Sequence, residues 1–537
     1  MQKSVHIWLG LVLTAGILLA ACAQPAQSPA PTTKPTVPAT TTAPPKASPT
    51  PAATPSGAPQ YGGVLRVSTG ASPRSLIPEP NYIRNWFNQA AYDTLLKLDE
   101  KGELQPNLAT EWKFSPDFKS LTLTLRKGVK FHDGTDFNAA AAKHSILVKQ
   151  AAKLGDYEGV ASVDIIDDYT LRLDISKFQN TLLSSMWFIA GLMHSPTAYQ
   201  QYSKADAQWK PVGTGPFKFV RYDVNALIKF ERFDGYWQKG KPYLDGFESV
   251  IIADATTREL ALRKGEVHAA EGLGGNIVSA MQKDGWTVMM GPPEVYNTFA
   301  GDSANPDSPF ANKKVREAVE YAIDREAVAK SLGYGFMQAV NQSAFSGTYP
   351  YVADLKGRSY DPAKAKQLLA EAGYPNGFKT TLLTIFSVAD TLTAAQGYLK
   401  AVGIDGTIDL ADSGRYYSLT QGSGWKNGLV YRARRPVPDW LSDINKELSV
   451  TSIDLKSTLR PPGFQDSLEK ALAAPDTASR NAAAQQVTKK IFDDVIVVPL
   501  WGANYTIVRG KNVNNLDYYA PWGPNKLWGP ADTWLSK

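Results

Sequence analysis

The segment at residues 235–242, GYWQKGKP, has the Gly-x4-Gly-Lys spacing of loops that bind nucleotide phosphates. In such a loop Ser or Thr follows the lysine and ligates magnesium, but this chain has Pro242 at that position. A phosphate loop also joins a strand to a helix, and the sequence here does not predict that context. We therefore interpret the spacing as a turn and not as a nucleotide site.

The chain has five histidines and one cysteine, and their spacing does not suit catalysis or metal binding. No pair among His6, His132, His144, His194 and His268 has the His-Glu-x-x-His spacing of a zinc helix. No Gly-x-Ser-x-Gly nucleophile elbow is present, and carboxylate pairs are expected in any chain with 51 acidic residues. The sequence thus predicts no catalytic residue, no metal site and no cofactor.

A stretch rich in arginine and proline, VYRARRPVPDWL, occupies residues 430–441. Proline removes a backbone donor and disfavours helical geometry in the residue before it, so we expect neither a helix nor a central strand here. Arg432, Arg434 and Arg435 suit a carboxylate, a phosphate or sugar hydroxyls, because a guanidinium presents several donors in one plane. A solvated basic loop is the alternative interpretation.

The N-terminus carries the features of an export signal. Lys3 precedes an apolar run over residues 7–21, which is shorter than the about 20 residues that span a bilayer. The run ends in Leu-Ala-Ala followed by Cys22, the sole cysteine. It resembles a bacterial lipoprotein signal, which predicts a signal peptide at 1–21 and lipid chains on Cys22. An ordinary export signal with an incidental cysteine is the alternative.

The predicted tether follows at residues 22–60, beginning with the lipidated cysteine. Eleven of residues 23–60 are proline and none is aromatic, so the segment cannot bury enough apolar surface to fold. No later stretch of sequence is long and apolar enough to span a membrane. We therefore expect an extracytoplasmic protein, lipid-anchored at the outer face of the cytoplasmic membrane or in the periplasm.

The charge of the remaining chain is nearly balanced. Three of the 57 basic residues and none of the 51 acidic residues lie in the first sixty positions, which leaves residues 61–537 at +3. This balance gives no electrostatic footprint for nucleic acid.

Local patterns in the long remainder predict a mixed α/β scaffold. Leucines at alternate positions from Leu121 to Leu125 predict a half-buried strand. A helix is expected over residues 139–149, with Thr135 or Asp136 as its cap. The chain is too long for one usual domain, so two or three are expected.

Two later segments carry helix signals at both ends. Asp324 is the expected cap of one helix, and Asp361, Pro362 and Gly373 fit the N-cap, first turn and C-terminal end of another. Before Asp324 an apolar helical face is predicted, made of Val315, Ala318, Val319, Ala322 and Ile323.

Six blocks of the sequence share the order and spacing of one known family. They lie at residues 91–146, 211–223, 230–250, 254–273, 312–328 and 360–378. The chain resembles the extracytoplasmic solute-binding proteins of ABC importers, family 5, typified by oligopeptide-, dipeptide- and nickel-binding receptors. The resemblance covers essentially all of residues 61–537, although these blocks are scaffold and identify the family better than the ligand.

The resemblance implies a two-lobed, periplasmic-binding-protein-like α/β fold of type II, with three domains that close like a flytrap. Lobe 1, domain I, would combine residues 61–100, 205–295 and 500–537. Residues 101–204 would form the inserted domain II, and residues 296–499 would form lobe 2, domain III. Segments near residues 295 and 500 would form the hinge.

The resemblance also implies a ligand cleft with aromatic walls and a few polar groups. Peptide-binding relatives commonly hold the peptide's amino terminus with an acid in the loop that residues 430–441 occupy. The comparison places Pro436 there, and Asp439 could substitute only in a rearranged loop. Trp286 is a further wall candidate. The candidate ligand-binding residues are Tyr82, Trp86, Trp187, Tyr431, Arg434, Arg435, Asp439, Trp440 and Trp501.

The function that follows is a monomeric substrate-binding lipoprotein without enzyme activity. It would capture a solute between its lobes and deliver it to the permease of an ABC importer. An oligopeptide is the first expectation for the solute, and an oligosaccharide or another small organic solute is the alternative. A sensory accessory receptor and an extracellular hydrolase are alternatives from other classes.

Overall fold

The computed structural model describes most of the chain after the tether, namely residues 57–78, 86–99, 102–202, 204–385, 389–434, 439–516 and 528–537. The predicted signal peptide, Cys22 and nearly all of the tether lie outside these residues, as do Tyr82, Arg435 and Pro436. Arg434 is described by its backbone alone.

The largest sheet among the described residues has eleven strands and contains two parallel groups. β1 is parallel to β10 and β11, and β14 is parallel to β15 and β16. The strand order is β15-β14-β16-β12-β17-β11-β1-β10-β9-β8, with β13 beside β17. The strands are β1 (Val64–Thr69), β8 (Phe217–Asp223), β9 (Leu227–Arg232), β10 (Gly246–Ile251), β11 (Ala269–Glu271), β12 (Thr287–Gly301), β13 (Met337–Ala339), β14 (Phe378–Ile385), β15 (Ile404–Ala411), β16 (Gly428–Arg434) and β17 (Val498–Arg509).

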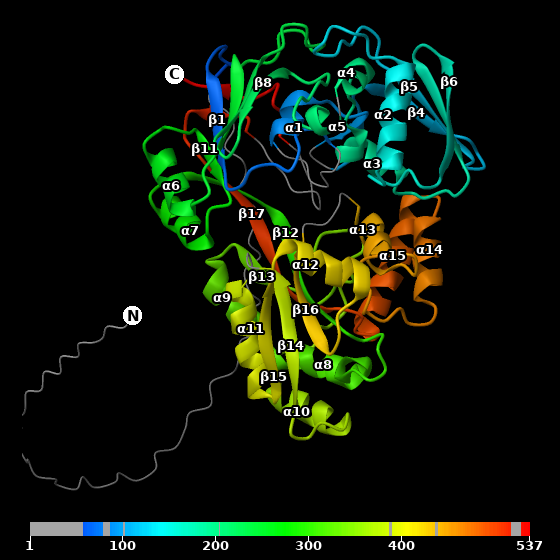
Figure 1. Cartoon of the computed structure of the whole chain (residues 1–537), viewed down its shortest axis with the longest axis vertical. Helices are drawn as coiled ribbons and strands as arrows, with labels where there is room; N and C mark the ends of the chain where they lie inside the picture. The colour runs from blue at the N-terminus through cyan, green and yellow to red at the C-terminus, as the bar shows by residue number, and fades with distance from the viewer. Residues whose placement is uncertain are drawn as a thin grey trace, which may run out of the picture. The chain divides into compact units, whose positions relative to one another are not determined.

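Two long strands, β12 and β17, connect the parallel groups. β17 pairs with β11 on one side, β12 pairs with β16 on the other, and the two strands pair with each other between them. Figure 1 shows them running from the elements around β1 to those around β14. Their register shifts on both sides of Pro293, which lacks an N–H for the ladder. The expected hinge falls on these strands, and its motion stays a prediction.

A separate antiparallel sheet, in the order β4-β5-β7-β6, lies within the segment expected as the inserted domain. Its strands are β4 (Ala109–Phe114), β5 (Ser120–Leu125), β6 (Val160–Asp167) and β7 (Thr170–Ile175), and α2 (Ala139–Ala151) packs beside β6. β5 confirms the alternating strand, since its three leucines are at most 2% exposed. The expected cap of α2 is wrong, because Asn138 accepts the hydrogen bond from the Ala141 N–H at 3.0 Å.

The predicted helix signals are confirmed in the other half of the chain. The apolar face of α8 (Lys313–Ala322) and the following Ile323 are at most 1% exposed. Asp324 caps α9 (Arg325–Gly333), and Asp361 caps α10 (Pro362–Glu371) by accepting the Lys364 N–H at 2.9 Å. Gly373 follows α10 with φ +93°, a conformation that glycine adopts without a Cβ clash.

The remaining described elements cover these sheets or lie at their edges. They are α1 (Trp86–Ala91), β2 (Leu96–Leu98), β3 (Leu104–Pro106), α3 (Leu182–Trp187), η1 (Ile189–Gly191), α4 (Pro196–Gln201), α5 (Lys204–Ala207), α6 (Ala255–Arg263), α7 (Gly275–Lys283), η2 (Pro309–Ala311), α11 (Ala389–Ala401), α12 (Ser413–Tyr417), η4 (Ser418–Ser423), α13 (Trp440–Leu448), α14 (Phe464–Leu472), α15 (Thr477–Asp493), β18 (Val513–Asn514) and β19 (Trp534–Leu535).

The apolar core is divided in a way that defines two lobes. One cluster joins side chains of β1 and α1 to those of β5, β7 and α2, so the sheet β4-β5-β7-β6 shares a core with the β1 group. Two other clusters are built from β12, β14, β16 and the helices α8 to α15. We call the first body, from β1 to α7 with β18 and β19, lobe 1, and the second, from η2 to α15, lobe 2. The domain boundaries expected from the sequence stay predictions.

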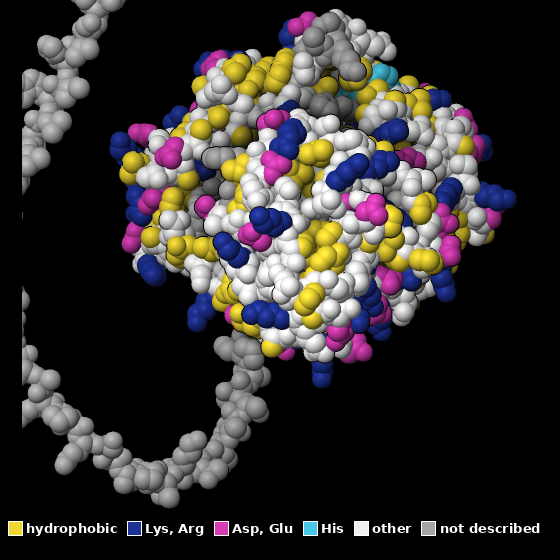
Figure 2. Space-filling view, turned by 60° about the horizontal axis from the view of Figure 1, so that its bottom comes forward, with side chains coloured by type: hydrophobic (Ala, Val, Ile, Leu, Met, Phe, Trp, Pro, Cys, Tyr) yellow, Lys and Arg dark blue, Asp and Glu magenta, His cyan; other side chains and the backbone are white. Residues whose placement is uncertain are grey.

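The surface of the described residues carries both charges in mixture. On the face shown in Figure 2, Lys and Arg side chains alternate with Asp and Glu side chains, without a continuous patch of one sign. No helix among the described residues is long and apolar enough to cross a bilayer.

His132 gives the fold a pH dependence. Its Nε2 lies 2.9 Å from the Gly215 carbonyl oxygen and its ring packs edge-on against Phe233. Burial lowers the pKa of His132 from 6.5 to about 4, although the Gly215 carbonyl and the Asp133 carboxylate oppose the shift. As pH falls, His132 is therefore protonated in the unfolded chain at a higher pH than in the folded protein. The free energy of unfolding decreases as pH falls from 6.5 toward 4.

We expect His132→Gln to reduce this pH dependence. Between pH 7 and pH 4.5 the wild type should lose about 2 kcal/mol more of its free energy of unfolding than the variant, because the variant has no imidazole to protonate. Urea denaturation at the two pH values measures the difference. An equal loss in both proteins would contradict the assignment.

Candidate functional site

The stretch of arginines and prolines is partly a strand. Residues 428–434 form β16, a central strand between β14 and β12, so the expectation that no central strand would form is wrong for its first part. Both β12 and β14 pair with this strand through their backbones, and the prolines come only after the strand ends. Arg434 is paired with Tyr296 of β12.

Arg432 lies in this strand as a buried ion-pair centre and not on a solvated loop. Its guanidinium contacts the Glu447 carboxylate and lies 2.8 Å from Asp454 Oδ2, and its side chain is 11% exposed. Burial alone would lower the pKa of Arg432, but the two carboxylates raise it above its ordinary value. The strand is thereby fixed to α13, which carries Glu447.

Asp439 begins α13 and organises its first turn. Its carboxylate accepts hydrogen bonds from the backbone N–H groups of Leu441 and Ser442, as an N-cap does. It also accepts the Tyr349 hydroxyl at 2.8 Å and contacts the Arg480 guanidinium. Asp439 is 4% exposed, so in this arrangement its carboxylate bonds to groups of the protein itself and is shielded from solvent. Its predicted contact with a ligand stays a prediction.

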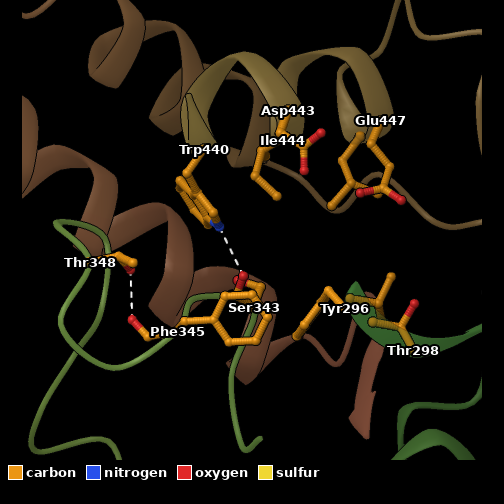
Figure 3. Close-up of a pocket in the computed structure, with 11 residues that line it drawn as sticks. Tyr296, Thr298, Ser343, Phe345, Thr348, Trp440, Asp443, Ile444 and Glu447 are labelled. Atoms are coloured by element: carbon orange, nitrogen blue, oxygen red, sulfur yellow. Dashed lines mark hydrogen bonds between the residues drawn. The ribbon is translucent and has the colours of Figure 1, made fainter. Parts of the chain in front are cut away.

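A small pocket lies between α13 and β12 (Figure 3). Trp440 forms one wall, held by a hydrogen bond from its Nε1 to the Ser343 carbonyl oxygen at 2.9 Å. The volume is about 30 Å³, which exceeds what one water needs and suits the end of a side chain or a terminal group. The pocket is lined by Tyr296, Thr298, Ser343, Phe345, Thr348, Trp440, Asp443, Ile444, Glu447, Leu448 and Val497.

The lining combines apolar walls with a few polar groups. Phe345, Ile444 and Trp440 supply apolar surface, while Asp443 and Glu447 stand one helical turn apart on α13. Such a mixture fits a ligand group with an apolar body and a polar end.

The start of α13 contacts lobe 1 at Ser184 and Asp156. The Ser184 hydroxyl donates to Asp439 Oδ2 at 3.1 Å, and the Ser442 hydroxyl donates to Asp156 Oδ1 at 2.7 Å. Trp187, a predicted wall residue, lies in the same short helix α3 as Ser184 and packs edge-on against Phe188. Of these predicted residues, Asp439 bonds across the boundary between the lobes, whereas Trp187 packs in the apolar cluster of lobe 1 and its predicted ligand contact stays a prediction.

Trp86 lies in lobe 1, at the start of α1. Its Nε1 donates to Glu271 Oε2 at 2.7 Å, and its ring packs against Trp528 with 4.9 Å between centroids. The Tyr505 hydroxyl also donates to Glu271. Trp86 directly follows the undescribed residues that include Tyr82, so its predicted ligand contact stays a prediction. Trp286 packs in a small apolar cluster of lobe 1.

Tyr431 and Trp501 lie in the core of lobe 2. Both are 0% exposed, and their rings pack at 6.1 Å between centroids. The Tyr431 hydroxyl donates to Asn297 Oδ1 at 3.0 Å, and burial raises the Tyr431 pKa. In this arrangement neither ring presents surface to a solute, and their predicted ligand role stays a prediction.

Four residues of the pocket and the boundary were missing from the sequence prediction, namely Ser343 in the pocket and Asp156, Ser184 and Ser442 at the boundary. Serines and a single aspartate carry no motif, and each reaches its partner only through tertiary contacts. No signal in the sequence distinguishes them from surface residues.

A wider polar groove of about 800 Å³ lies in lobe 1, between α1, the β2–β3 hairpin and residues 528–532. Asp93 in its wall accepts the Trp237 Nε1 hydrogen at 2.9 Å and the Thr214 hydroxyl at 3.1 Å. Lys241 is paired with Asp532. These contacts join parts of lobe 1, and none of the predicted site residues whose side chains the structure describes lines the groove.

Metal ligands are not grouped in the part of the chain that the structure describes. No cluster of three or more His, Cys, Asp or Glu side chains there is arranged to hold an ion.

Comparison with known proteins assigns the family. The profile of bacterial extracellular solute-binding proteins, family 5 (middle), matches residues 103–427, more than half of the chain. The chain belongs to this family. It is 32% identical over 443 residues to the glutathione-binding protein GsiB of Escherichia coli (strain K12), a match that covers 79% of this chain and 85% of GsiB.

Solved structures of family 5 proteins confirm the predicted two-lobed, type II α/β fold. The periplasmic binding protein DppA of Helicobacter pylori, in complex with the peptide STSA, matches with a TM-score of 0.76 at 25% identity. That match covers 89% of this chain and 99% of DppA. NikA of Brucella suis, in complex with Fe(III)-EDTA, has the same fold with a TM-score of 0.77 at 20% identity, over 86% of this chain and 98% of NikA.

The family places this protein among the substrate-binding receptors of ABC importers, and the receptor function predicted from the sequence is confirmed. The family is a family of binding proteins. Its members work outside the cytoplasm together with membrane permeases.

Proposed function

We propose that this family 5 receptor captures a short peptide-type solute that reaches the pocket between α13 and β12, and delivers it unaltered to its permease. The observation that carries the proposal is the 32% identity to a glutathione-binding protein over 85% of that protein's length. Glutathione is a tripeptide with an amino group, carboxylates and amide groups.

The pocket beside α13 supports this class of solute. The indole of Trp440 and the ring of Phe345 offer apolar walls to a side chain. The Asp443 carboxylate stands in the same lining and supplies an acidic group, which Pro436 as a residue type cannot. A peptide end that reaches this lining would meet both kinds of group.

Calorimetric titration with a matched panel tests the class of solute. We expect glutathione or a di- to tetrapeptide to bind in the micromolar range, equivalent to about −8 kcal/mol, and to be recovered intact after incubation. Oligosaccharides of similar mass should produce no heat. Binding of a saccharide without any peptide would overturn the proposal in favour of the alternative solute, and a cleaved solute would indicate a hydrolase.

We further propose that the receptor is monomeric. We also propose that lipid on Cys22 anchors it, because that cysteine follows Leu-Ala-Ala at the end of the apolar run. Lipid chains hold a protein at a membrane through burial of their carbon atoms. Cys22→Ser should therefore move the protein from the membrane fraction to the soluble extracytoplasmic fraction. An unchanged distribution on fractionation would contradict the anchor, and light scattering that gives a dimer mass would contradict the monomer.

A further inference from the structure

We propose that the inserted domain is the latch of this receptor: Asp156, Asn180 and Ser184 hold lobe 2 in the closed position and so set the affinity for any solute that requires closure. The inference rests on the receptor function and not on the class of solute. These residues are positioning residues, since they act through the position of the lobes.

The first contact of the latch caps a helix across the boundary. The Asn180 side chain donates from Nδ2 to the carbonyl oxygens of Ala471 at 2.8 Å and Ala474 at 3.0 Å. Its backbone N–H donates to the Leu472 carbonyl oxygen at 2.8 Å. The last four carbonyl oxygens of a helix receive no hydrogen bond from an N–H of the same helix. Helix α14 ends at Leu472. Asn180 of lobe 1 therefore satisfies the end of a lobe 2 helix.

The second contact is a buried carboxylate that reaches α13. Asp156 is 5% exposed, and within its own domain it is positioned by Ser185, whose Oγ accepts the Asp156 N–H at 2.8 Å. Across the boundary Asp156 Oδ1 accepts the Ser442 hydroxyl at 2.7 Å and lies 3.2 Å from Lys446 Nζ. Charge-assisted hydrogen bonds of this kind are stronger than neutral ones.

The third contact joins Ser184 to the N-cap of α13. Asp439 is fixed inside lobe 2 by Tyr349 and Arg480, and its Oδ2 accepts the Ser184 hydroxyl at 3.1 Å. The three contacts thus engage the start of α13 and the end of α14 from one side, and Figure 1 shows α3 above these helices. An exposed ion pair, Lys177 with Glu469, lies at the rim.

The character of this boundary distinguishes a latch from a fixed domain interface. The inserted domain shares its apolar cluster with lobe 1, and no described side chain of lobe 2 belongs to that cluster. The specific contacts with α13 and α14 are polar and can be exchanged for water when the lobes separate. A receptor whose closed state is only partly populated binds with an affinity reduced by that fraction.

Removing one latch contact should release the others, which provides the test. In Ser442→Ala we expect the Asn180 amide, which donates to Leu472, to exchange its hydrogen about 2- to 10-fold faster than in the wild type, since one hydrogen bond contributes about that factor to closure. Hydrogen exchange of the full-length protein, read by mass spectrometry over residues 177–185, measures this without added solute. Lys446→Ala should act in the same direction.

Lys177→Ala is the matched control, because an exposed pair contributes little and its loss should change exchange less than 2-fold. Unchanged exchange in both Ser442→Ala and Lys446→Ala would overturn the latch. With glutathione as probe, the dissociation constant should also rise, by the factor by which the closed fraction falls. If glutathione does not bind the wild type, the peptide proposal for that ligand fails, while the exchange result still decides the latch.

Discussion

Arg432→Met should lower the free energy of unfolding by about 3–5 kcal/mol, the cost expected when one partner of a buried ion pair is removed. Methionine fills a similar volume but leaves Glu447 and Asp454 without the cation that compensates them. Both carboxylates are at most 17% exposed, so water replaces the guanidinium poorly. Urea denaturation followed by circular dichroism measures the loss.

Lys177→Met is the control for the removal of a charge. Lys177 also pairs with a carboxylate, but its side chain is 62% exposed and that of Glu469 is 47% exposed. We expect no measurable loss of stability from it, because surface pairs contribute little. A similar effect of both substitutions would contradict the interpretation of Arg432 as a buried centre.

Trp440→Ala should weaken binding of glutathione, or of the tightest peptide from the titration panel, by at least about 30-fold. A buried tryptophan in a ligand pocket commonly contributes 2 kcal/mol or more when truncated. The substitution removes the main wall of the pocket and the hydrogen bond to Ser343. Calorimetric titration measures the change, and Trp440→Phe should recover most of the affinity because it restores an aromatic wall.

Trp209→Ala is the matched control for loss of an indole. Trp209 stacks on Tyr222 with 5.3 Å between ring centroids, and neither lines the Trp440 pocket. Its dissociation constant should equal that of the wild type. If Trp440→Ala also binds with unchanged affinity, the pocket beside α13 is not part of the solute site.

Much of the scaffold could be predicted from the sequence because its signals are local. The caps at Asp324 and Asp361 depend on residues within one turn, and the alternating leucines of β5 need only their own strand to be recognised. The cap of α2 was assigned to the wrong residue because Thr135, Asp136 and Asn138 all have suitable side chains close to the helix start. Only the backbone geometry at Asn138 decides among them.

The site was less predictable because its contacts are distant in sequence. Arg432 is 15 residues from Glu447 and 22 from Asp454 in the chain. The prolines that follow β16 argued against a central strand in this segment. Ser442 is 286 residues from Asp156, and no pattern connects them. Trp440 was predicted from its residue type and from the family resemblance, and the structure places it in the wall of a pocket.

The most direct test of the proposed function is mass spectrometry of the solute that stays bound when the full-length protein is purified from its own host without denaturation. We predict that the released molecules fragment as short peptides, with amide-bond cleavage series, and that Trp440→Ala retains much less of them. A single defined saccharide, or another solute without amide fragments, would contradict the account.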